Sequence, residues 1–169
     1  MSSLTDYKGL QVLTPDPVGA GGLAINNNFK HLADSFQSAR RDSTLTINST
    51  SLATSGLSFD VKNGDTWRFE FNLFATSLNS SADLRLQVDG PGNGRCSFIN
   101  IEIAQVRSAA LNSLSSTLSV DTGSDDLIQV NGIMEATSDG TVELRLRNNS
   151  TSTTQTFSEW SYFIAQRID

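Results

Sequence analysis

One stretch of ten residues decides the fold class of this chain: Thr66-Trp67-Arg68-Phe69-Glu70-Phe71-Asn72-Leu73-Phe74-Ala75. Large apolar residues occupy every second position from Trp67 to Leu73, and polar residues stand between them. Because successive side chains of a β-strand point to opposite faces, this alternation predicts a strand with one buried and one solvated face. A turn signal, Asn63-Gly64-Asp65, comes directly before it.

The same alternation recurs between turn signals throughout residues 43–169. Roughly nine strands are expected there, at the spacing typical of two packed sheets. We therefore predict a mainly β fold, an antiparallel jelly-roll-like β-sandwich that forms a head domain over 43–169. Two hairpins are expected within it. One turns at the glycine-rich segment 90–94 and leads into a strand containing Ile99, Ile101 and Ile103, and the other turns at Ser138-Asp139-Gly140. The segment 106–118 is interpreted as a loop followed by a strand.

The first 42 residues follow a different pattern. Pro15, Pro17 and the glycine cluster at 19–22 prevent a continuous helix, so residues 1–22 are predicted to form an extended arm. Residues 23–42 are predicted to contain one short amphipathic helix, because its apolar residues are spaced by four, three and four. These residues are Ile25, Phe29, Leu32 and Phe36. The stripe fits either a helix that covers its own β-domain or a three-fold contact between subunits.

The last predicted strand is apolar on both faces. Trp160 and Tyr162 lie on one face of this segment and Phe163 lies on the other. One face meets the core, and the second needs cover from another strand, the helix or a neighbouring subunit. Together with the stripe at 25–36, this strand predicts a homotrimer. Its expected interface residues are Ile25, Phe29, Leu32, Phe36, Trp160, Tyr162 and Phe163.

The composition argues against catalysis and against binding to nucleic acid. Ser and Thr supply 40 of the 169 residues, and the net charge is −6, which opposes approach to a phosphate backbone. One cysteine, Cys96, and one histidine, His31, leave no disulfide framework and few metal or nucleophile sites. We expect no enzyme activity, no cofactor and no metal site. The sequence shows neither a secretory signal nor an apolar run long enough to span a membrane.

Three features allow a second interpretation. The loop from Asp121 to Asp126 offers carboxylates to a cation but matches no complete calcium-loop pattern, so ion binding there stays open. Trp67 and Trp160 are possible sugar-stacking platforms, although burial in the core or in a subunit interface is favoured. Cys96 is expected to be a buried, inert thiol on a strand.

The stretch from Tyr7 to Asp34, YKGLQVLTPDPVGAGGLAINNNFKHLAD, resembles the N-terminal segment of tailed-bacteriophage virion proteins. It is similar to the attachment arms of trimeric fibres and capsid cement proteins, cyanophage proteins among them. The resemblance implies a virion structural protein that is made in the host cytoplasm and engages the particle through its arm. Expected capsid-binding residues are Tyr7, Leu10, Val12, Leu13, Pro15 and Pro17.

A compact cement, or decoration, protein bound to the major capsid protein is favoured, because the chain has no long shaft. A short tail-fibre protein or adhesin with a receptor-binding head is the alternative, and a carbohydrate-active enzyme is a distant third. A cement protein requires its arm, an adhesin requires a ligand-sized pocket in the head, and an enzyme requires convergent titratable groups.

Overall fold

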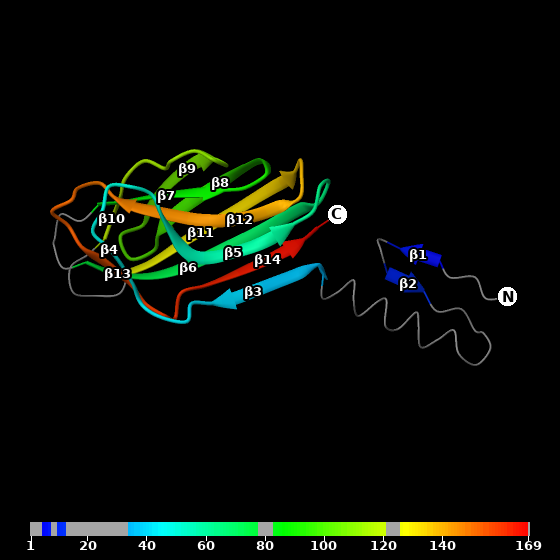
Figure 1. Cartoon of the computed structure of the whole chain (residues 1–169), viewed down its shortest axis with the longest axis horizontal. Helices are drawn as coiled ribbons and strands as arrows, with labels where there is room; N and C mark the ends of the chain where they lie inside the picture. The colour runs from blue at the N-terminus through cyan, green and yellow to red at the C-terminus, as the bar shows by residue number, and fades with distance from the viewer. Residues whose placement is uncertain (1–4, 8–9, 13–33, 78–82, 121–125, 169) are drawn as a thin grey trace.

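The computed structural model describes residues 5–7, 10–12, 34–77, 83–120 and 126–168. These residues form fourteen β-strands, and all the strand pairs are antiparallel (Figure 1). Twelve of the strands belong to two facing sheets, one of four strands and one of eight. The predicted mainly β, antiparallel sandwich is confirmed.

The small sheet has the strand order β10-β7-β12-β5. Its strands are β10 (Leu118–Ser119), β7 (Asp83–Asp89), β12 (Gly140–Asn148) and β5 (Ala53–Val61). β12 lies between β7 and β5 and pairs along most of its length with both. Apolar side chains at every second position of these strands face the large sheet, as a half-buried strand requires.

The large sheet has the order β3-β14-β6-β11-β8-β9. Its strands are β3 (Phe36–Arg40), β14 (Tyr162–Arg167), β6 (Thr66–Ser77), β11 (Asp126–Ala136), β8 (Gly92–Asn100) and β9 (Gln105–Ala110). Two short strands extend it: β13 (Gln155–Phe157) pairs with β6 and with β4 (Leu45–Ile47). β13 and β14 thus lie one after the other along the same edge of β6.

The core lies between the sheets and is rich in aromatic rings. Trp67, Phe69 and Phe71 project into it from β6 with 0–2% exposure, as the alternation of residues 66–75 predicts. Phe59 of the small sheet lies 5.5 Å from Trp67, 5.7 Å from Phe69 and 5.8 Å from Phe163, measured between ring centroids. One ring from the small sheet therefore contacts rings on two strands of the large sheet and joins the two layers.

Both predicted hairpins are wrong, although the strands beside the turns exist. β7 belongs to the small sheet and β8 to the large one, so Gly90 and Pro91 carry the chain from one layer to the other. The turn at 137–139 likewise connects β11 of the large sheet to β12 of the small sheet. Alternation and turn residues locate strands, but they do not say which strand is the hydrogen-bonding partner.

Two other segments differ from the expectation. The helix predicted over 23–42 is wrong at its C-terminal end, because residues 36–40 form β3 and pair with β14; residues 23–33 lie outside the described part. The segment 106–118, interpreted as a loop followed by a strand, begins with most of β9, so the loop is wrong at 106–110, whereas the strand expected after it is present as β10. In both cases pairing with a neighbouring strand outweighs a weak local pattern.

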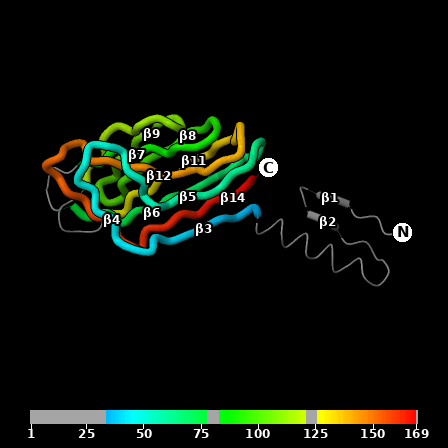
Figure 2. Tube along the Cα trace, viewed as in Figure 1, coloured from blue at the N-terminus to red at the C-terminus, as the bar shows by residue number. Residues whose placement is uncertain are grey.

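The N-terminal strands β1 (Thr5–Tyr7) and β2 (Leu10–Val12) pair with each other (Figure 1). They pair with neither sheet of the sandwich, in which the edge strand β3 runs beside β14 (Figure 2). The β1–β2 pairing differs from the single extended arm that the prolines and glycines predict. That residues 1–22 serve for attachment stays a prediction.

Candidate binding face on the large sheet

The exposed large hydrophobic residues of the described chain lie on the strands of the large sheet or in the segments joined to them. Eight such residues occur in the described part of the chain: Phe36, Ile101, Ile103, Val106, Ile133, Trp160, Ile164 and Ile168. Each belongs to a strand of the large sheet or to a turn or end directly joined to one. Surface hydrophobic residues scattered singly need no explanation, but eight that all lie on or directly beside one of two sheets do.

The strand register shows how the outward side chains of the large sheet are arranged. One row across the sheet contains Phe36, Gln166, Arg68 and Ile133, in that order. The next row contains Ser38, Ile164, Glu70 and Asn131, and the third contains Arg40, Tyr162, Asn72 and Gln129. We call this surface the outer face of the large sheet.

Polar side chains on the central strands of this face are bonded to one another. Asn72 Nδ2 donates to Glu70 Oε1 at 2.6 Å, and Gln129 Nε2 donates to Asn72 Oδ1 at 3.3 Å. Asn131 Nδ2 donates to Gln129 Oε1 at 3.0 Å. The centre of the face is thus a fixed polar strip with apolar residues on both sides, a mixture found in many protein interfaces.

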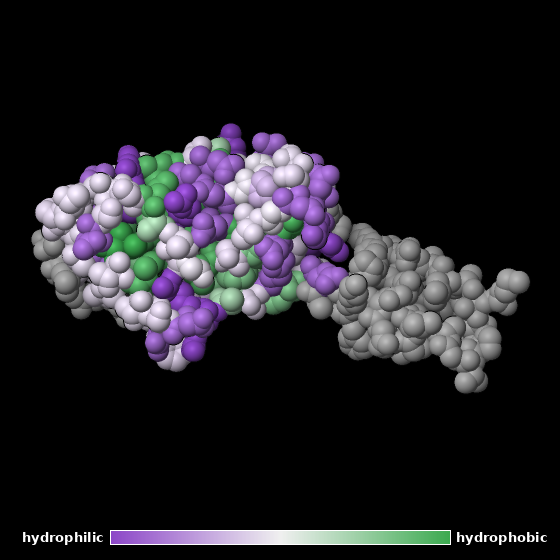
Figure 3. All heavy atoms as spheres, in the orientation of Figure 1, coloured by the Kyte–Doolittle hydropathy of each residue, from purple (hydrophilic) through white to green (hydrophobic). Residues whose placement is uncertain are grey.

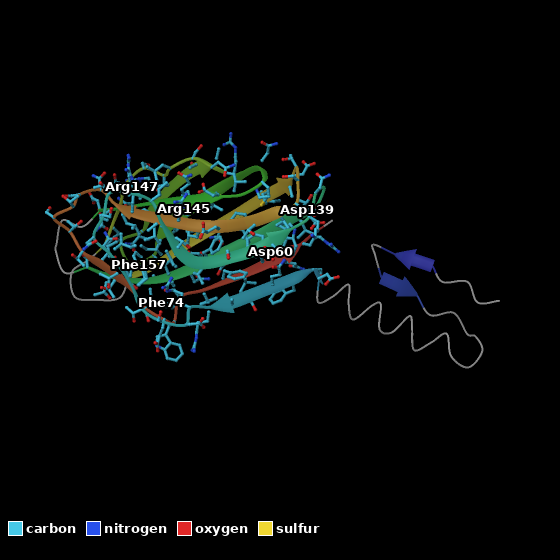
Figure 4. All side chains as sticks on the ribbon, viewed as in Figure 1. Asp60, Phe74, Asp139, Arg145, Arg147 and Phe157 are labelled. Carbon is cyan, nitrogen blue, oxygen red and sulfur yellow. The ribbon has the colours of Figure 1, made fainter. Side chains whose placement is uncertain are left out.

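A hollow of about 670 Å³ lies at the corner where β13 ends and β14 begins. Its walls come from β3, β6 and the turn before β14, and its lining residues are Ser38, Ala39, Arg40, Phe74, Ser158, Trp160 and Tyr162. Trp160 is 60% exposed, and the Arg40 guanidinium lies 4.7 Å from its ring centroid. Phe74, on β6, is labelled in Figure 4.

The predicted interface residues are only partly brought together. Phe36, Trp160 and Tyr162 reach the outer face or its corner, whereas Phe163 is 3% exposed and packs inward against Phe59 and Phe71. Phe163 is therefore wrong as an interface residue, because its side of β14 faces the core. Ile25, Phe29 and Leu32 lie outside the described residues.

The predicted arm residues fall partly outside the described chain as well. Tyr7, Leu10 and Val12 lie in the β1–β2 pair, where only the backbone is described. Leu13, Pro15 and Pro17 lie outside the described residues. Their proposed contacts with a capsid stay predictions.

Sequence reasoning missed Arg40, Phe74 and Ser158 as residues of the hollow. Phe74 carried a usable signal, because it interrupts the alternation at a position where the strand should be polar. Ile133 carried the same signal, since it points outward from β11 next to the buried Met134. One such apolar residue on the polar side of a strand is ordinary, but several on the same face indicate a contact surface.

The titratable groups of the described residues do not converge on the hollow. Cys96 is buried, and burial raises the pKa of its thiol to about 12, so it is protonated at neutral pH. No group of three His, Cys, Asp or Glu side chains suited to a metal occurs in the described part. Asp126 is buried and accepts a 2.7 Å bond from Asn100 Nδ2; residues 121–125 of the suggested cation loop and His31 lie outside that part.

No protein-family model and no curated protein sequence matches this chain. Solved structures with a similar arrangement include the CBM22-1 and GH10 modules of Clostridium thermocellum xylanase 10B complexed with xylohexaose, at 13% identity and a TM-score of 0.41. That match covers 81% of this chain and 25% of the xylanase chain. Another is the carbohydrate-binding module CBM6cm-2 of Cellvibrio mixtus lichenase 5A with cellotriose, at 11% identity and a TM-score of 0.29, covering 80% and 88%.

These likenesses are at the level of the β-sandwich fold, and at such scores they carry no argument about function. In the described residues, no helix has the length and apolar character needed to cross a bilayer.

Proposed function

We propose that this chain is a non-enzymatic structural protein of a tailed-phage particle. In this proposal it is a trimeric cement protein that binds the major capsid protein through its N-terminal arm. The observation that carries the association is the placement of all eight exposed large hydrophobic residues of the described chain on or beside the large sheet. The similarity of residues 7–34 to phage virion arms supports the attachment.

The outer face of the large sheet has the composition of a subunit contact. It presents Phe36, Ile133 and Ile164, exposed by 50%, 51% and 38%, around a hydrogen-bonded polar strip. Each Å² of apolar surface removed from water contributes about 25 cal/mol, so a few such side chains from each subunit offset part of the entropy of association. Three copies that bring these faces together would cover the second apolar side of β14.

The N-terminal segment is suited to a different contact. The β1–β2 pair joins neither sheet, so the head closes its core without it. Pro15 and Pro17 restrict the following segment and lower the entropy that it loses on docking. These features support an arm that binds outside its own head.

Deletion of residues 1–21 tests the arm. We expect thermal unfolding of the head to stay nearly unchanged, while binding to capsids lacking this protein is abolished and the particles lose resistance to heat. A full-length variant, Thr141→Ala, on the outer side of the small sheet, is the matched control and should decorate normally. Normal decoration by the truncated protein, or a head that fails to fold, would contradict the cement mechanism.

Sedimentation equilibrium of the full chain tests the trimer. A mass three times that of the 18.2 kDa chain is expected at micromolar concentration. A monomer under these conditions contradicts a constitutive trimer.

A second candidate function, a short tail-fibre protein or adhesin, is favoured by one specific observation. The head contains a ligand-sized hollow with three aromatic side chains in its lining, the feature that distinguishes an adhesin from a cement protein. In that case the head, rather than the arm, makes the recognition contact.

A further inference from the structure

We infer that the hollow beside Trp160 is a carbohydrate-binding site in which a sugar ring stacks on the exposed face of the indole. This inference rests on the second candidate function, the adhesin. It assigns the ligand class to the corner of the large sheet, away from the row that contains Phe36 and Ile133.

The turn that displays Trp160 is held by hydrogen bonds from backbone N–H groups to backbone carbonyls and serine hydroxyls. Ser158 N donates to Phe74 O at 2.9 Å, and Phe74 N donates to Ser161 Oγ at 3.1 Å, so both ends of the turn are fixed to β6. Arg41 N donates to Ser161 O at 2.9 Å, which fixes the same turn to the chain after β3. Within the turn, Trp160 N donates to Ser158 Oγ at 3.2 Å.

This anchoring matters because a pre-ordered side chain loses little entropy when a ligand binds. The Arg40 guanidinium, 4.7 Å from the ring centroid, further restricts the indole and covers part of its surface. The two tryptophans of the chain differ sharply, since Trp67 is 1% exposed and Trp160 is 60% exposed. A large apolar ring held in water by a fixed turn is a feature of a binding surface.

The lining matches the two-sided chemistry of a pyranose. Such a ring has a C–H face that packs on an aromatic ring and an edge of hydroxyl groups that need hydrogen-bond partners. Trp160, Phe74 and Tyr162 supply the apolar surface. Ser38, Ser158 and Arg40 supply two hydroxyl groups and a guanidinium, which is the small number of polar groups typical of a ligand pocket.

The charge of the lining narrows the ligand class. Among the described lining residues, Arg40 is the one that carries a charge, and none is a carboxylate. Neutral and acidic sugars are therefore accepted, whereas ligands carrying an ammonium group gain no ion pair there. A purely apolar peptide would leave the Arg40 and serine donors without partners, which disfavours it.

The test uses the full chain, a panel of neutral, acidic and amino-sugar oligosaccharides, and an array of bacterial surface glycans. Binding is followed by calorimetry and by tryptophan fluorescence, in which buried Trp67 gives a constant background. We expect Trp160→Ala to weaken binding by at least about tenfold and Trp160→Phe to weaken it less. Val106→Ala, which shortens a 56% exposed side chain on β9 at the opposite edge of the large sheet, is the matched control and should bind normally.

Several outcomes overturn the inference: no saccharide binds, binding survives Trp160→Ala, or sugars with a free ammonium group bind best. A fall in sedimentation mass on Trp160→Ala, without saccharide binding, would instead assign Trp160 to the subunit interface. The chain lacking residues 1–21 separates the proposals. If it binds sugar but does not decorate capsids, the head carries the sugar site and the arm carries attachment to the particle. If decoration is arm-dependent and no sugar binds, the cement proposal stands, and this inference fails together with the adhesin alternative.

Discussion

The outer faces of the two sheets differ in how their side chains are satisfied. On the small sheet the outward residues are polar and bonded among themselves: Arg145 Nη1 pairs with Asp89 Oδ2 at 3.2 Å, and Thr141 Oγ1 donates to Asp60 Oδ1 at 2.9 Å. Arg145 and Arg147 lie along β12, and Asp60 lies toward the other end of the sandwich (Figure 4). None of the eight exposed large hydrophobic residues belongs to a strand of this sheet.

On the large sheet, by contrast, polar and apolar side chains share the outer surface. The space-filling view shows hydrophilic side chains over much of the sandwich, with smaller hydrophobic areas between them (Figure 3). The difference teaches that the two sides of the sandwich are not equivalent. The outer face of the small sheet is polar and hydrogen-bonded, whereas the outer face of the large sheet exposes apolar side chains that a contact with another molecule would bury. Strand alternation alone requires no such difference, because both sheets have one buried side.

The largest effect is expected where the large sheet faces inward. Phe71→Ala removes a fully buried ring that lies 5.6 Å from Phe69 and 5.9 Å from Phe163, so we expect a loss of about 3–5 kcal/mol in the free energy of unfolding. Phe74→Ala, on the outward side of the same strand, should cost clearly less. Urea unfolding of both variants measures the difference, and equal losses would mean that the outer face is as tightly packed as the core.

A smaller loss of stability is expected at β11, where two neighbouring residues should differ clearly in their response to substitution. A Cβ at Gly132 would overlap the ring of Phe69, so Gly132→Ala should destabilise the head by about 1–3 kcal/mol even though it adds one methyl group. Ile133→Ala removes more carbon, but from a 51% exposed side chain, and should change stability by about 0.5 kcal/mol or less. Thermal unfolding measures the two losses of stability. A larger loss from Ile133→Ala than from Gly132→Ala would mean that Ile133, and not Gly132, faces the core.

The two outer faces are compared directly by adding the same charge to each. Ile164→Arg on β14 should weaken self-association by at least about tenfold, because a guanidinium in a contact between copies is desolvated without a partner. Thr141→Arg on β12 should leave the mass unchanged. Sedimentation equilibrium gives the result, and a monomer–trimer balance that responds to Thr141→Arg alone would move the interface to the small sheet.

The smallest effect concerns Asp139, in the turn between β11 and β12. Bonds from Asn63 N at 2.9 Å and from Lys62 Nζ at 3.1 Å lower the pKa of this carboxyl below its ordinary value of 3.8. The ionised form is thus favoured in the folded state, so its contribution is complete above pH 3.8 and is lost as the pH falls through the lower folded pKa. Asp139→Asn should lower the urea midpoint slightly at pH 7, and the difference should vanish in acid; a difference that grows in acid would contradict the sign.

The sequence predicts the strands of the sandwich better than their pairing. Period-two alternation is a property of each strand, so Trp67, Phe69 and Phe71 are placed correctly in the core. Whether β7 pairs with β8 depends on which layer each strand joins, and this depends on contacts distant in the chain. Apolar character does not give the inward side of β8, because Ile99 points outward while its neighbours Phe98 and Asn100 are buried and Asn100 bonds to Asp126.

The candidate site is harder to predict for a related reason. The aromatic residues of the hollow come from segments far apart in the sequence, Phe74 on β6 and Trp160 and Tyr162 near β14. Their proximity follows from β13 and β14 sharing an edge of β6. Trp160 belongs to the alternating residues that predict the last strand. In the structure that strand begins only at Tyr162, and Trp160 lies in the turn before it, so its ring is exposed instead of buried.

The position of β3 determines how the head responds to mechanical load. β3 is the first strand of the sandwich and the edge strand of the large sheet, and residues 36–40 pair with β14 in five register positions. Tension on the N-terminal segment, directed along the strand, loads these pairs together in shear instead of opening them one after another. Arg167 N, which donates to Ser35 O at 2.8 Å, lies directly before the first pair and shares the load. A pull on residue 36 along β3 would therefore have to break the five β3–β14 pairs together, whereas a pull across the strand would open them one after another.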